Sequence, residues 1–293
     1  MRGLLPQASR RRRGELSASF CLVFNAVAVN NSPAETLSEA RNRTGSLKMW
    51  RRFRKRAEVN SPKLPSGSRV YAVGDVHGRA DLLQETFAKI DSHREAYPIA
   101  NAHEIMLGDY IDRGPSSFDV IEILSKRVHG GTICLKGNHE AFLLEFLKDP
   151  TVLSAWQRCG GLETLASYGL EPSLDLSPED EESFAARLTK RLPAHHYNFL
   201  IALPLSFTLG DYFFVHAGVR PRVALSNQRA EDLLWIREEF LRYEGSFGKF
   251  VVHGHTPVSE PEIRNNRLNI DTGAFASGNL TCAVFEDDQI SFL

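Results

Sequence analysis

Short apolar runs alternate with amphipathic stretches along the chain from residue 68 onward, and the runs end at or just before a glycine. The runs at 70–73, 103–107 and 132–135 have the length and bounding glycines of buried strands. In the stretches that follow them, apolar residues recur every three or four positions, which predicts helices with one face against a core. Successive strand–helix units are typical of an α/β sheet with parallel strands. The apolar positions of the three expected helices are Leu82, Leu83, Phe87 and Ile90, then Phe118, Val120, Ile121 and Leu124, then Phe142, Leu143, Leu144, Phe146 and Leu147.

Toward the C-terminus the pattern changes to a series of short strands. Before them a further helix is expected, with Ser177 as its N-cap and Pro178 at its first position. The segment 60–67 is rich in Pro, Ser and Gly and marks a boundary. We therefore expect a basic extension and linker over 1–66, followed by one domain of about 225 residues over 67–293. The strands expected in the C-terminal part cover 212–215, 250–252, 268–270 and 280–285.

The composition is that of a globular protein with a sizeable core. Of the 293 residues, 42% are hydrophobic and 24% are charged, which excludes collagen-like, coiled-coil and wholly disordered chains. The longest apolar run, from Phe20 to Val29, contains Asn25 and falls short of the roughly 20 residues that span a bilayer, so no membrane span is expected. The four cysteines form no CxxC pair, which indicates neither a disulfide framework nor a cysteine zinc site. A reducing, cytoplasmic setting follows as the expectation.

Charge is distributed unevenly along the chain. Residues 1–58 hold thirteen Lys and Arg against four Glu, whereas the rest holds 22 basic and 32 acidic residues. Such basic runs can bind nucleic acid or anionic lipid, but no recognisable nucleic-acid-binding module accompanies the charge here, and a solvated tail is the preferred interpretation. A secretory signal is disfavoured because Glu15 and Asn25 interrupt its expected pattern. Met49 is an alternative start of the protein.

Polar side chains gather at the points where the expected strands end. Ligand groups in parallel α/β sheets lie on the loops that leave the carboxyl ends of the strands. A single Asp or His in such a loop is more often structural than catalytic, but here five strand ends each supply Asp, Asn or His, including five of the ten histidines. Carboxylate, amide and imidazole groups together suit Mn, Fe or Zn. His93, His129 and His195 lack such a setting and are expected to be surface or core residues. The five loops are Gly74-Asp75-Val76-His77-Gly78, Gly108-Asp109-Tyr110-Ile111-Asp112-Arg113-Gly114, Gly137-Asn138-His139-Glu140, Val215-His216-Ala217-Gly218 and His253-Gly254-His255-Thr256.

This series of loops, in this order, resembles the calcineurin-like metallophosphoesterase superfamily, from Val70 to the C-terminus. The resemblance implies an α/β fold of two packed, mixed β-sheets flanked by helices, which the strand pattern alone does not distinguish from one open sheet. Thr256 follows His255 where many nuclease members have a second histidine, which disfavours the nuclease branch. Asp112-Arg113-Gly114 and the third loop resemble the phosphoprotein phosphatase branch, which includes symmetrical diadenosine tetraphosphatases. The stretches 156–169 and 232–237 resemble the bacterial serine/threonine phosphatase group within it.

The resemblance also implies roles for most of the polar loop residues, although it implies no ligand role for His253. Two divalent cations are expected, Mn²⁺ in preference to Fe or Zn, to activate a water molecule that attacks the phosphate ester. Asp109 would bridge both cations. His139 would protonate the leaving oxygen, with Asp112 orienting its imidazole. Arg220 is a further candidate for substrate contact, with a packing role equally open. The remaining assignments are Asp75 and His77 as ligands of the first cation, Asn138, His216 and His255 as ligands of the second, and Arg113, Asn138 and Arg237 as phosphate-binding residues.

Three functions are consistent with these residues. The favoured one is a metal-dependent serine/threonine protein phosphatase, with phosphotyrosine as a further option, because of the resemblance of the stretch 156–169. The alternative is a symmetrical bis(5'-nucleosyl)-tetraphosphatase or another nucleotide pyrophosphohydrolase. A nucleic-acid-binding scaffold is the third, and it is disfavoured because an inactive domain need not retain all six metal-ligand positions. The expected partner is therefore a phosphorylated protein or a nucleotide, with nucleic acid limited to nonspecific contact by the basic tail.

Overall fold

The computed structural model describes residues 61–171 and 178–293. The basic clusters, the apolar run from Phe20 to Val29, Met49 and the expected N-cap Ser177 lie outside these residues. Within the described part of the chain, no helix is both long enough and apolar enough to cross a membrane.

The first sheet is mixed and has the strand order β10-β9-β1-β2-β3. Its parallel centre consists of β1 (Ser68–Val73), β2 (Asn101–Met106) and β3 (Ile133–Cys134), with Val73 paired to Met106 and Met106 to Cys134. The C-terminal strands β9 (Cys282–Glu286) and β10 (Gln289–Phe292) extend it in antiparallel fashion along β1. The strand–helix units expected from the sequence therefore form the parallel part of this sheet.

The second sheet has the strand order β4-β5-β6-β8-β7 and is also mixed. Its parallel centre is β5 (Tyr212–Val215), β6 (Phe250–His253) and β8 (Arg267–Asn269). Antiparallel edge strands close both sides, β4 (Ser206–Leu209) beside β5 and β7 (Glu262–Ile263) beside β8. The expectation of two mixed sheets is confirmed. The sequence pattern missed β4, β7 and β10, which are partly exposed and carry no continuous apolar run.

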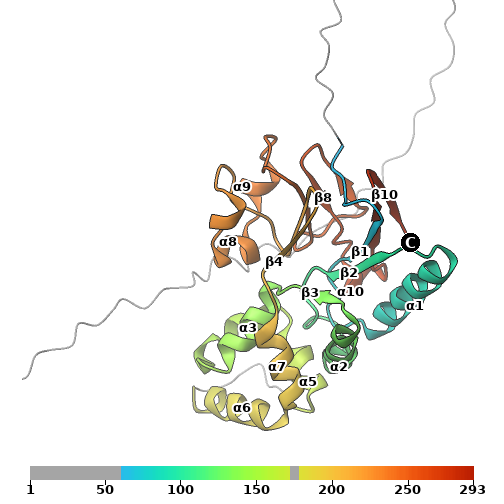
Figure 1. Ribbon diagram of the computed structural model, residues 1–293. Helices are drawn as coiled ribbons and strands as arrows, with labels where there is room; N and C mark the ends of the chain where they lie inside the picture. Colours follow the sequence, from blue (N-terminus) through green and yellow to red (C-terminus); the bar gives the residue numbers. More distant parts are fainter. Residues whose placement is uncertain (1–60, 172–177) are drawn as a thin grey trace, which may run out of the picture. The chain divides into compact units, whose positions relative to one another are not determined.

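Three hydrophobic cores hold the layers together. Successive side chains of a strand point to opposite faces of its sheet, so neighbouring residues of one strand belong to different cores. Val70 and Ala72 of β1 pack with Tyr212 and Phe214 of β5 in a core between the two sheets. The intervening residues of these strands point to the opposite face. Those of β1 pack with the helices that cover the first sheet, and those of β5 pack with α8 and α9 (Figure 1). Because both faces of the central strands are buried, these strands read as continuous apolar runs in the sequence.

The helices are placed on the outer faces of the sheets (Figure 1). Those expected after β1, β2 and β3 are confirmed, as is the one that begins at Pro178. The sequence pattern did not identify α4, α5 or α7–α10, most of which are short. The helices are α1 (Ala80–Ala96), α2 (Ser117–Arg127), α3 (Asn138–Phe146), α4 (Leu153–Arg158), α5 (Gly161–Ser167), α6 (Pro178–Arg191), α7 (Ala194–Ala202), α8 (Ala230–Trp235), α9 (Glu238–Leu241) and α10 (Ala274–Ser277), with short 3₁₀ helices at Val128–Gly130, Pro150–Val152 and Leu225–Asn227.

Part of the expected linker packs against the domain. Leu64 is buried in the core between the sheets, and its backbone N–H donates to the carbonyl of Asp287. Lys63 and Asp211 exchange two hydrogen bonds, and the hydroxyl of Tyr212 donates to the carbonyl of Pro62. These contacts anchor the chain before β1, so the segment from Pro62 to Pro65 is structurally part of the sheet layer.

Candidate active site

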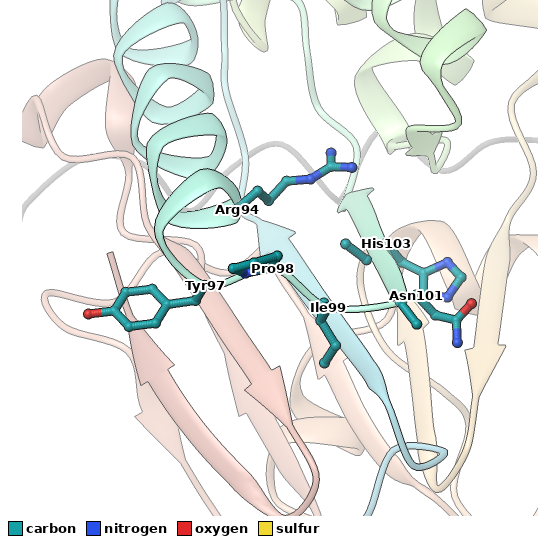
Figure 2. Close-up of a pocket in the computed structure, with 8 residues that line it drawn as sticks. Arg94, Tyr97, Pro98, Ile99, Asn101 and His103 are labelled. Carbon is teal, nitrogen blue, oxygen red and sulfur yellow. The ribbon is translucent and has the colours of Figure 1, made fainter.

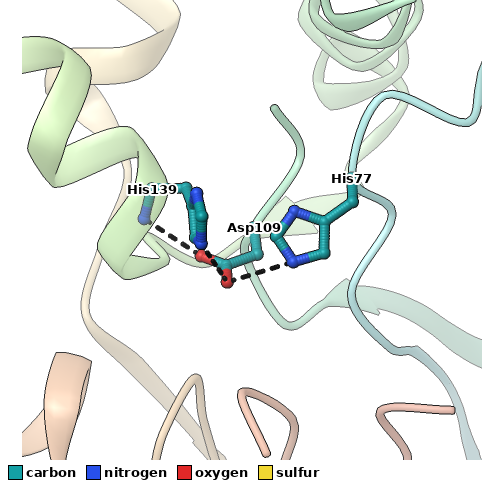
Figure 3. Close-up of side chains that lie close together, drawn as sticks. All are labelled: His77, Asp109 and His139. Atoms are coloured by element: carbon teal, nitrogen blue, oxygen red, sulfur yellow. Dashed lines mark hydrogen bonds and ion pairs between the residues drawn. The ribbon is translucent and has the colours of Figure 1, made fainter. Parts of the chain in front are cut away.

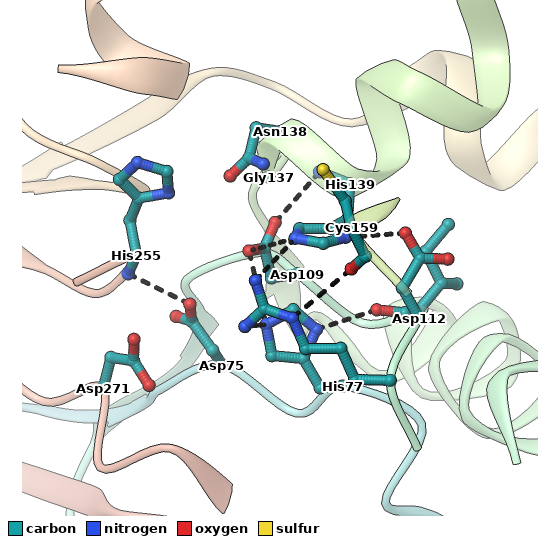
Figure 4. Close-up of polar contacts among 12 residues, drawn as sticks. Asp75, His77, Asp109, Asp112, Gly137, Asn138, His139, Cys159, His255 and Asp271 are labelled. Atoms are coloured by element: carbon teal, nitrogen blue, oxygen red, sulfur yellow. Dashed lines mark hydrogen bonds and ion pairs between the residues drawn. The ribbon is translucent and has the colours of Figure 1, made fainter. Parts of the chain in front are cut away.

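Six parallel strands, three from each sheet, are each followed within four residues by a buried polar residue of one cluster (Figure 4). In parallel α/β folds the loops at the carboxyl ends of strands form the ligand site. Here the carboxyl ends of both sheets contribute to the same cluster. The six strand-end residues are Asp75 after β1, Asp109 after β2, Asn138 after β3, His216 after β5, His255 after β6 and Asp271 after β8.

The backbone of these loops is held in an unusual conformation. Of the seven non-glycine residues with positive φ in the described chain, five belong to the site: His77, Asp109, Asp112, Arg113 and His255. A side chain disfavours this region, so such residues persist where the surrounding structure requires them, and they concentrate at functional sites.

Close approach of the loops depends on two glycines. A Cβ at Gly254 would lie 2.0 Å from Oδ1 of Asp75, and one at Gly137 would lie 2.1 Å from Oδ1 of Asp109. Both contacts are far inside van der Waals distance, so any side chain here would displace a site carboxylate. The glycines in these motifs therefore make room for the carboxylates.

Asp109 stands at the centre of the cluster (Figure 3). Its Oδ2 atom lies 3.6 Å from Nε2 of His77 and 3.7 Å from Nε2 of His139. Its Oδ1 atom lies 3.3 Å from Nε2 of His216, and the ligand atoms of Asp109, His216 and His255 are all within 4.8 Å of one another. One carboxylate thus presents a different oxygen to each of two groups of imidazoles, so its two oxygens could serve two separate cations.

A cation fits where the lone pairs of two acceptor atoms face each other with no hydrogen between them. Nδ1 of His216 donates to the carbonyl of Leu107 at 3.0 Å, and burial lowers the pKa of this imidazole, so its Nε2 carries a lone pair. That atom lies 2.8 Å from Oδ1 of Asn138, which is also an acceptor. Nε2 of His77 also carries a lone pair, because its Nδ1 donates to the carbonyl of Ile111 at 2.9 Å, and Arg113 donates to that lone pair. At Asn138 and His216 two acceptors face each other, and a metal ion would bind them.

The carboxylates point to the same conclusion. Burial, together with the neighbouring Asp271 and Asp109, raises the pKa of Asp75, and its buried Oδ1 has no hydrogen-bond partner in the described chain. Burial raises the pKa of Asp271 to about 6, with Asp109 adding to the effect. Clustered buried carboxylates oppose one another's ionisation unless positive charge is supplied. The set of oxygen and imidazole ligands, without a thiolate, fits divalent cations such as Mn²⁺, Fe²⁺ or Zn²⁺.

A separate network fixes the orientation of His139. Its Nδ1 atom lies 2.6 Å from Oδ2 of Asp112, and the indole Nε1 of Trp156 donates to the same oxygen at 2.7 Å. Thr164 donates to Oδ1 of Asp112 at 2.5 Å, so the buried carboxylate has a partner on each oxygen. Burial alone would lower the pKa of His139, but Asp109 and Asp112 outweigh it and raise the pKa above its usual value. His139 is thus held with Nε2 toward the cluster and with its cationic form favoured.

Two arginines add positive charge beside the cluster. The guanidinium of Arg113 donates to Nε2 of His77 at 3.0 Å and lies 3.3 Å from Nε2 of His139, over the ring of Phe275. Arg237 makes no side-chain hydrogen bond or ion pair with residues 61–171 or 178–293, yet burial lowers its pKa and it interacts electrostatically with Asp109 and Arg113. A guanidinium held there is available to an anionic substrate.

Comparison with known proteins identifies the family. The family model for calcineurin-like phosphoesterases matches residues 68–278, which is most of the chain. The chain belongs to the calcineurin-like phosphoesterase family. It is 30% identical over 231 residues to the asymmetrical bis(5'-nucleosyl)-tetraphosphatase PrpE of Bacillus mycoides, covering 71% of this chain and 87% of that protein. The protein of the same name from Bacillus subtilis is 28% identical over 229 residues, with the same two coverages.

A solved structure supports the fold. A crystal structure provisionally described as that of a diadenosine tetraphosphatase superposes with a TM-score of 0.55 at 20% identity, covering 79% of this chain and 97% of that one. The calcineurin-like phosphoesterase assignment makes this chain a hydrolase of a family that uses divalent metals.

These relatives correct the function favoured from the sequence. The prediction of a serine/threonine protein phosphatase is wrong, because the matching relatives are tetraphosphatases. It rested on the stretch 156–169, and the structure gives that stretch another role: Trp156 and Thr164 bind Asp112. The nucleotide alternative is the better one, although these relatives are named asymmetrical rather than symmetrical.

Two functional residues were missed from the sequence. Glu140 accepts hydrogen bonds from the backbone N–H groups of Asp109, Tyr110 and Gly137 at 2.7–3.0 Å, and so it joins the loops after β2 and β3. Its position three residues after the N-cap Gly137 is the sequence signal of a capping box. Asp271 follows β8 as Asp75 follows β1, so the strand-end rule that identified the other residues also points to it.

Arg220 and His253 form contacts of their own. Arg220 pairs with Asp232 at 2.5 Å and with Glu239 at 2.8 Å, a network that accounts for it without substrate. His253 lies against Phe240 and Arg267, where burial lowers its pKa to about 3.

A surface cavity is also separate from the site. It measures about 410 Å³ and lies between the end of α1 and the start of β2, where Arg94, Tyr97 and Asn101 line it (Figure 2). It is at the opposite end of β2 from Asp109.

Proposed function

We propose that this protein is a metal-dependent hydrolase of dinucleoside polyphosphates, and that it cleaves bis(5'-nucleosyl)-tetraphosphates asymmetrically. The observation that carries the substrate class is the similarity to the asymmetrical tetraphosphatases, which extends over 71% of this chain and 87% of the Bacillus mycoides protein. The chemistry is supported by Asp109, which presents one oxygen to His77 and the other to His216.

In this proposal the ligands form two sets that share Asp109. Asp75 and His77 complete the first, and Asn138, His216 and His255 complete the second. When bound, the two cations would activate a water molecule and offset the negative charge of the phosphate oxygens. Mn²⁺ is the proposed metal, because carboxylate and amide oxygens suit it and no thiolate is among the ligands to favour zinc.

The remaining residues act on the substrate. His139 donates a proton from Nε2 to the leaving phosphate oxygen, while Asp112 holds its Nδ1 and stabilises the cation. Arg113, Arg237 and the side-chain amide of Asn138 bind the phosphate oxygens, for which the planar guanidinium fork of arginine is well suited. The polyphosphate chain, with more negative charge than a phosphomonoester, matches a site with two guanidinium groups.

Aromatic side chains on two sides of the site support a substrate with two bases. Trp235 lies 6.4 Å from His255 and 5.2 Å from Phe142, measured between ring centroids, and it is partly exposed. Phe275 lies 5.5 Å from His77, on the side of the other ligand set, and is also partly exposed. Aromatic rings of this kind can stack on a nucleobase.

Product analysis tests this function. The full chain is incubated with Mn²⁺ and diadenosine tetraphosphate, and the nucleotides are separated by anion exchange. Asymmetrical cleavage yields ATP and AMP in equal amounts, and Asp109→Asn should abolish both. Formation of ADP alone would refute the asymmetrical mode. An intact dinucleotide under conditions where the enzyme hydrolyses p-nitrophenyl phosphate would refute the substrate class.

A further inference from the structure

A second group of metal-type side chains lies among the helices that cover the first sheet, apart from the strand-end loops. It consists of Glu122 on α2 and the neighbouring His195 and His196 at the start of α7. Oε2 of Glu122 lies 2.7 Å from Nε2 of His195 and 2.8 Å from Nε2 of His196. The ligand atoms of all three residues lie within 4.8 Å of one another. Two helices distant in sequence therefore direct two imidazoles and a carboxylate at one point.

The environment of His196 prepares it as a ligand. The residue is fully buried, and its two ring nitrogens face different partners, Tyr168 and Glu122. Its Nδ1 lies 2.9 Å from the hydroxyl of Tyr168, an oxygen that can accept a proton donated by Nδ1. With the proton on Nδ1, the lone pair of Nε2 faces Glu122. Metal-binding histidines are oriented in the same way, by a partner on the second nitrogen.

We propose that Glu122, His195 and His196 bind a zinc ion through Oε2 and the two Nε2 atoms, with water as the fourth ligand. Two imidazoles, a carboxylate and one open position form a ligand set that zinc accepts in tetrahedral geometry, at bond lengths of about 2.0–2.2 Å. The three atoms must move apart by roughly half an ångström to surround an ion at these bond lengths. His195 is 57% exposed and Glu122 is partly exposed, so both side chains can turn. Lys126 pairs with the other oxygen of Glu122 at 2.7 Å and leaves Oε2 to the ion.

The zinc ion would act as a structural brace behind the active site. It would join α2 to α7 and, through Tyr168 at the end of α5, engage a third helix. The first turn of α2 contains Ser117 and α5 contains Thr164, and the hydroxyl groups of both accept the backbone N–H of Asp112. Two of the three helices tied together by the ion, α2 and α5, thus hold Asp112. We expect the ion to raise the melting temperature and to leave the chemical step to the strand-end residues.

Zinc stoichiometry tests the proposal. The full chain is stripped with a chelator, dialysed against Zn²⁺ alone, and analysed for bound metal, and its melting temperature is recorded with and without Zn²⁺. His195→Ala should bind one zinc ion fewer per chain than the wild type and should lose part of the zinc-dependent rise in Tm. Glu122→Gln should behave in the same way.

The controls separate this site from the strand-end site. His129→Ala removes an exposed histidine just after α2 and should bind as much zinc as the wild type. The part of the zinc-dependent rise in Tm that His195→Ala abolishes should persist in Asp109→Asn. It should be lost in the double variant that carries both Asp109→Asn and His195→Ala. Equal zinc content in the wild type, His195→Ala and Glu122→Gln would overturn the proposal.

Discussion

Nδ1 of His139 lies 2.6 Å from Oδ2 of Asp112, and neither side chain is accessible to more than a trace of solvent. Trp156 donates to the same carboxylate oxygen, and Thr164 to the other. The Asp112 carboxylate is therefore held by two donors, and it holds the imidazole in turn. This network orients the imidazole of His139 for the proton donation proposed above, whereas Nδ1 of His77 donates to a backbone carbonyl.

The Asp112 carboxylate should set the alkaline limit of activity. A protonated His139 is required for proton donation, so activity falls as pH rises through its pKa. Asp112 raises that pKa by stabilising the cation, and Asp112→Asn removes this effect. We expect the alkaline limb of kcat/KM for diadenosine tetraphosphate to move to lower pH in Asp112→Asn. An alkaline limb at the wild-type position, with kcat reduced at all pH values, would show that Asp112 does not control this proton.

Glu140 should stabilise the two loops that it joins. Its buried carboxylate accepts the N–H groups of Asp109, Tyr110 and Gly137, and burial, with Asp109, raises its pKa to about 7. Glu140→Gln leaves one oxygen for these donors, and each buried donor left unpaired costs roughly 1–3 kcal/mol. We expect a lower Tm by calorimetry and a lower kcat, because Asp109 is displaced. Glu145→Gln, on the same helix and without a side-chain partner in the described chain, should match the wild type; an equal loss in both variants would contradict the assignment.

Arg237 should contribute to substrate binding. Its guanidinium is partly buried beside Asp109 and Arg113 and has no protein partner in the described ranges. Arg237→Ala should raise KM for the dinucleotide more than it changes Tm, because the truncation breaks no internal ion pair. Arg242→Ala is the matched control, since Arg242 forms an exposed pair with Glu238. Unchanged steady-state constants in Arg237→Ala would remove this residue from the site.

The position of the domain boundary should be visible in two truncations. A chain beginning at Ser61 should keep the full kcat, because every site residue lies in the later part. A chain beginning at Gly67 also lacks buried Leu64 and the hydrogen bonds of Lys63 with Asp211. Burying a leucine contributes about 1.5–3 kcal/mol, so the shorter chain should melt at a lower temperature. Identical melting curves for the two truncations would place the boundary at Gly67 after all.

The sequence predicts those site residues that directly follow an apolar strand. Asp75, Asp109 and His216 each follow an apolar strand directly, and parallel strands bring such loops to one edge. Asp271 obeys the same rule and could have been found by it. Trp156 and Thr164 could not, because they reach Asp112 across 44 and 52 residues, and their hydrogen bonds depend on how α4 and α5 pack. The edge strand β10 was missed for a related reason: pairing with β9 forms it, not its own alternation.

The most direct test of the central claim compares two substrates on one preparation of the enzyme. The values of kcat/KM with Mn²⁺ are measured for diadenosine tetraphosphate and for a phosphoserine peptide, with a chelated sample and Asp109→Asn as controls. The account predicts the higher value for the dinucleotide and loss of its hydrolysis in both controls. A higher value for the phosphopeptide, or full dinucleotide hydrolysis by the metal-free enzyme, would contradict it.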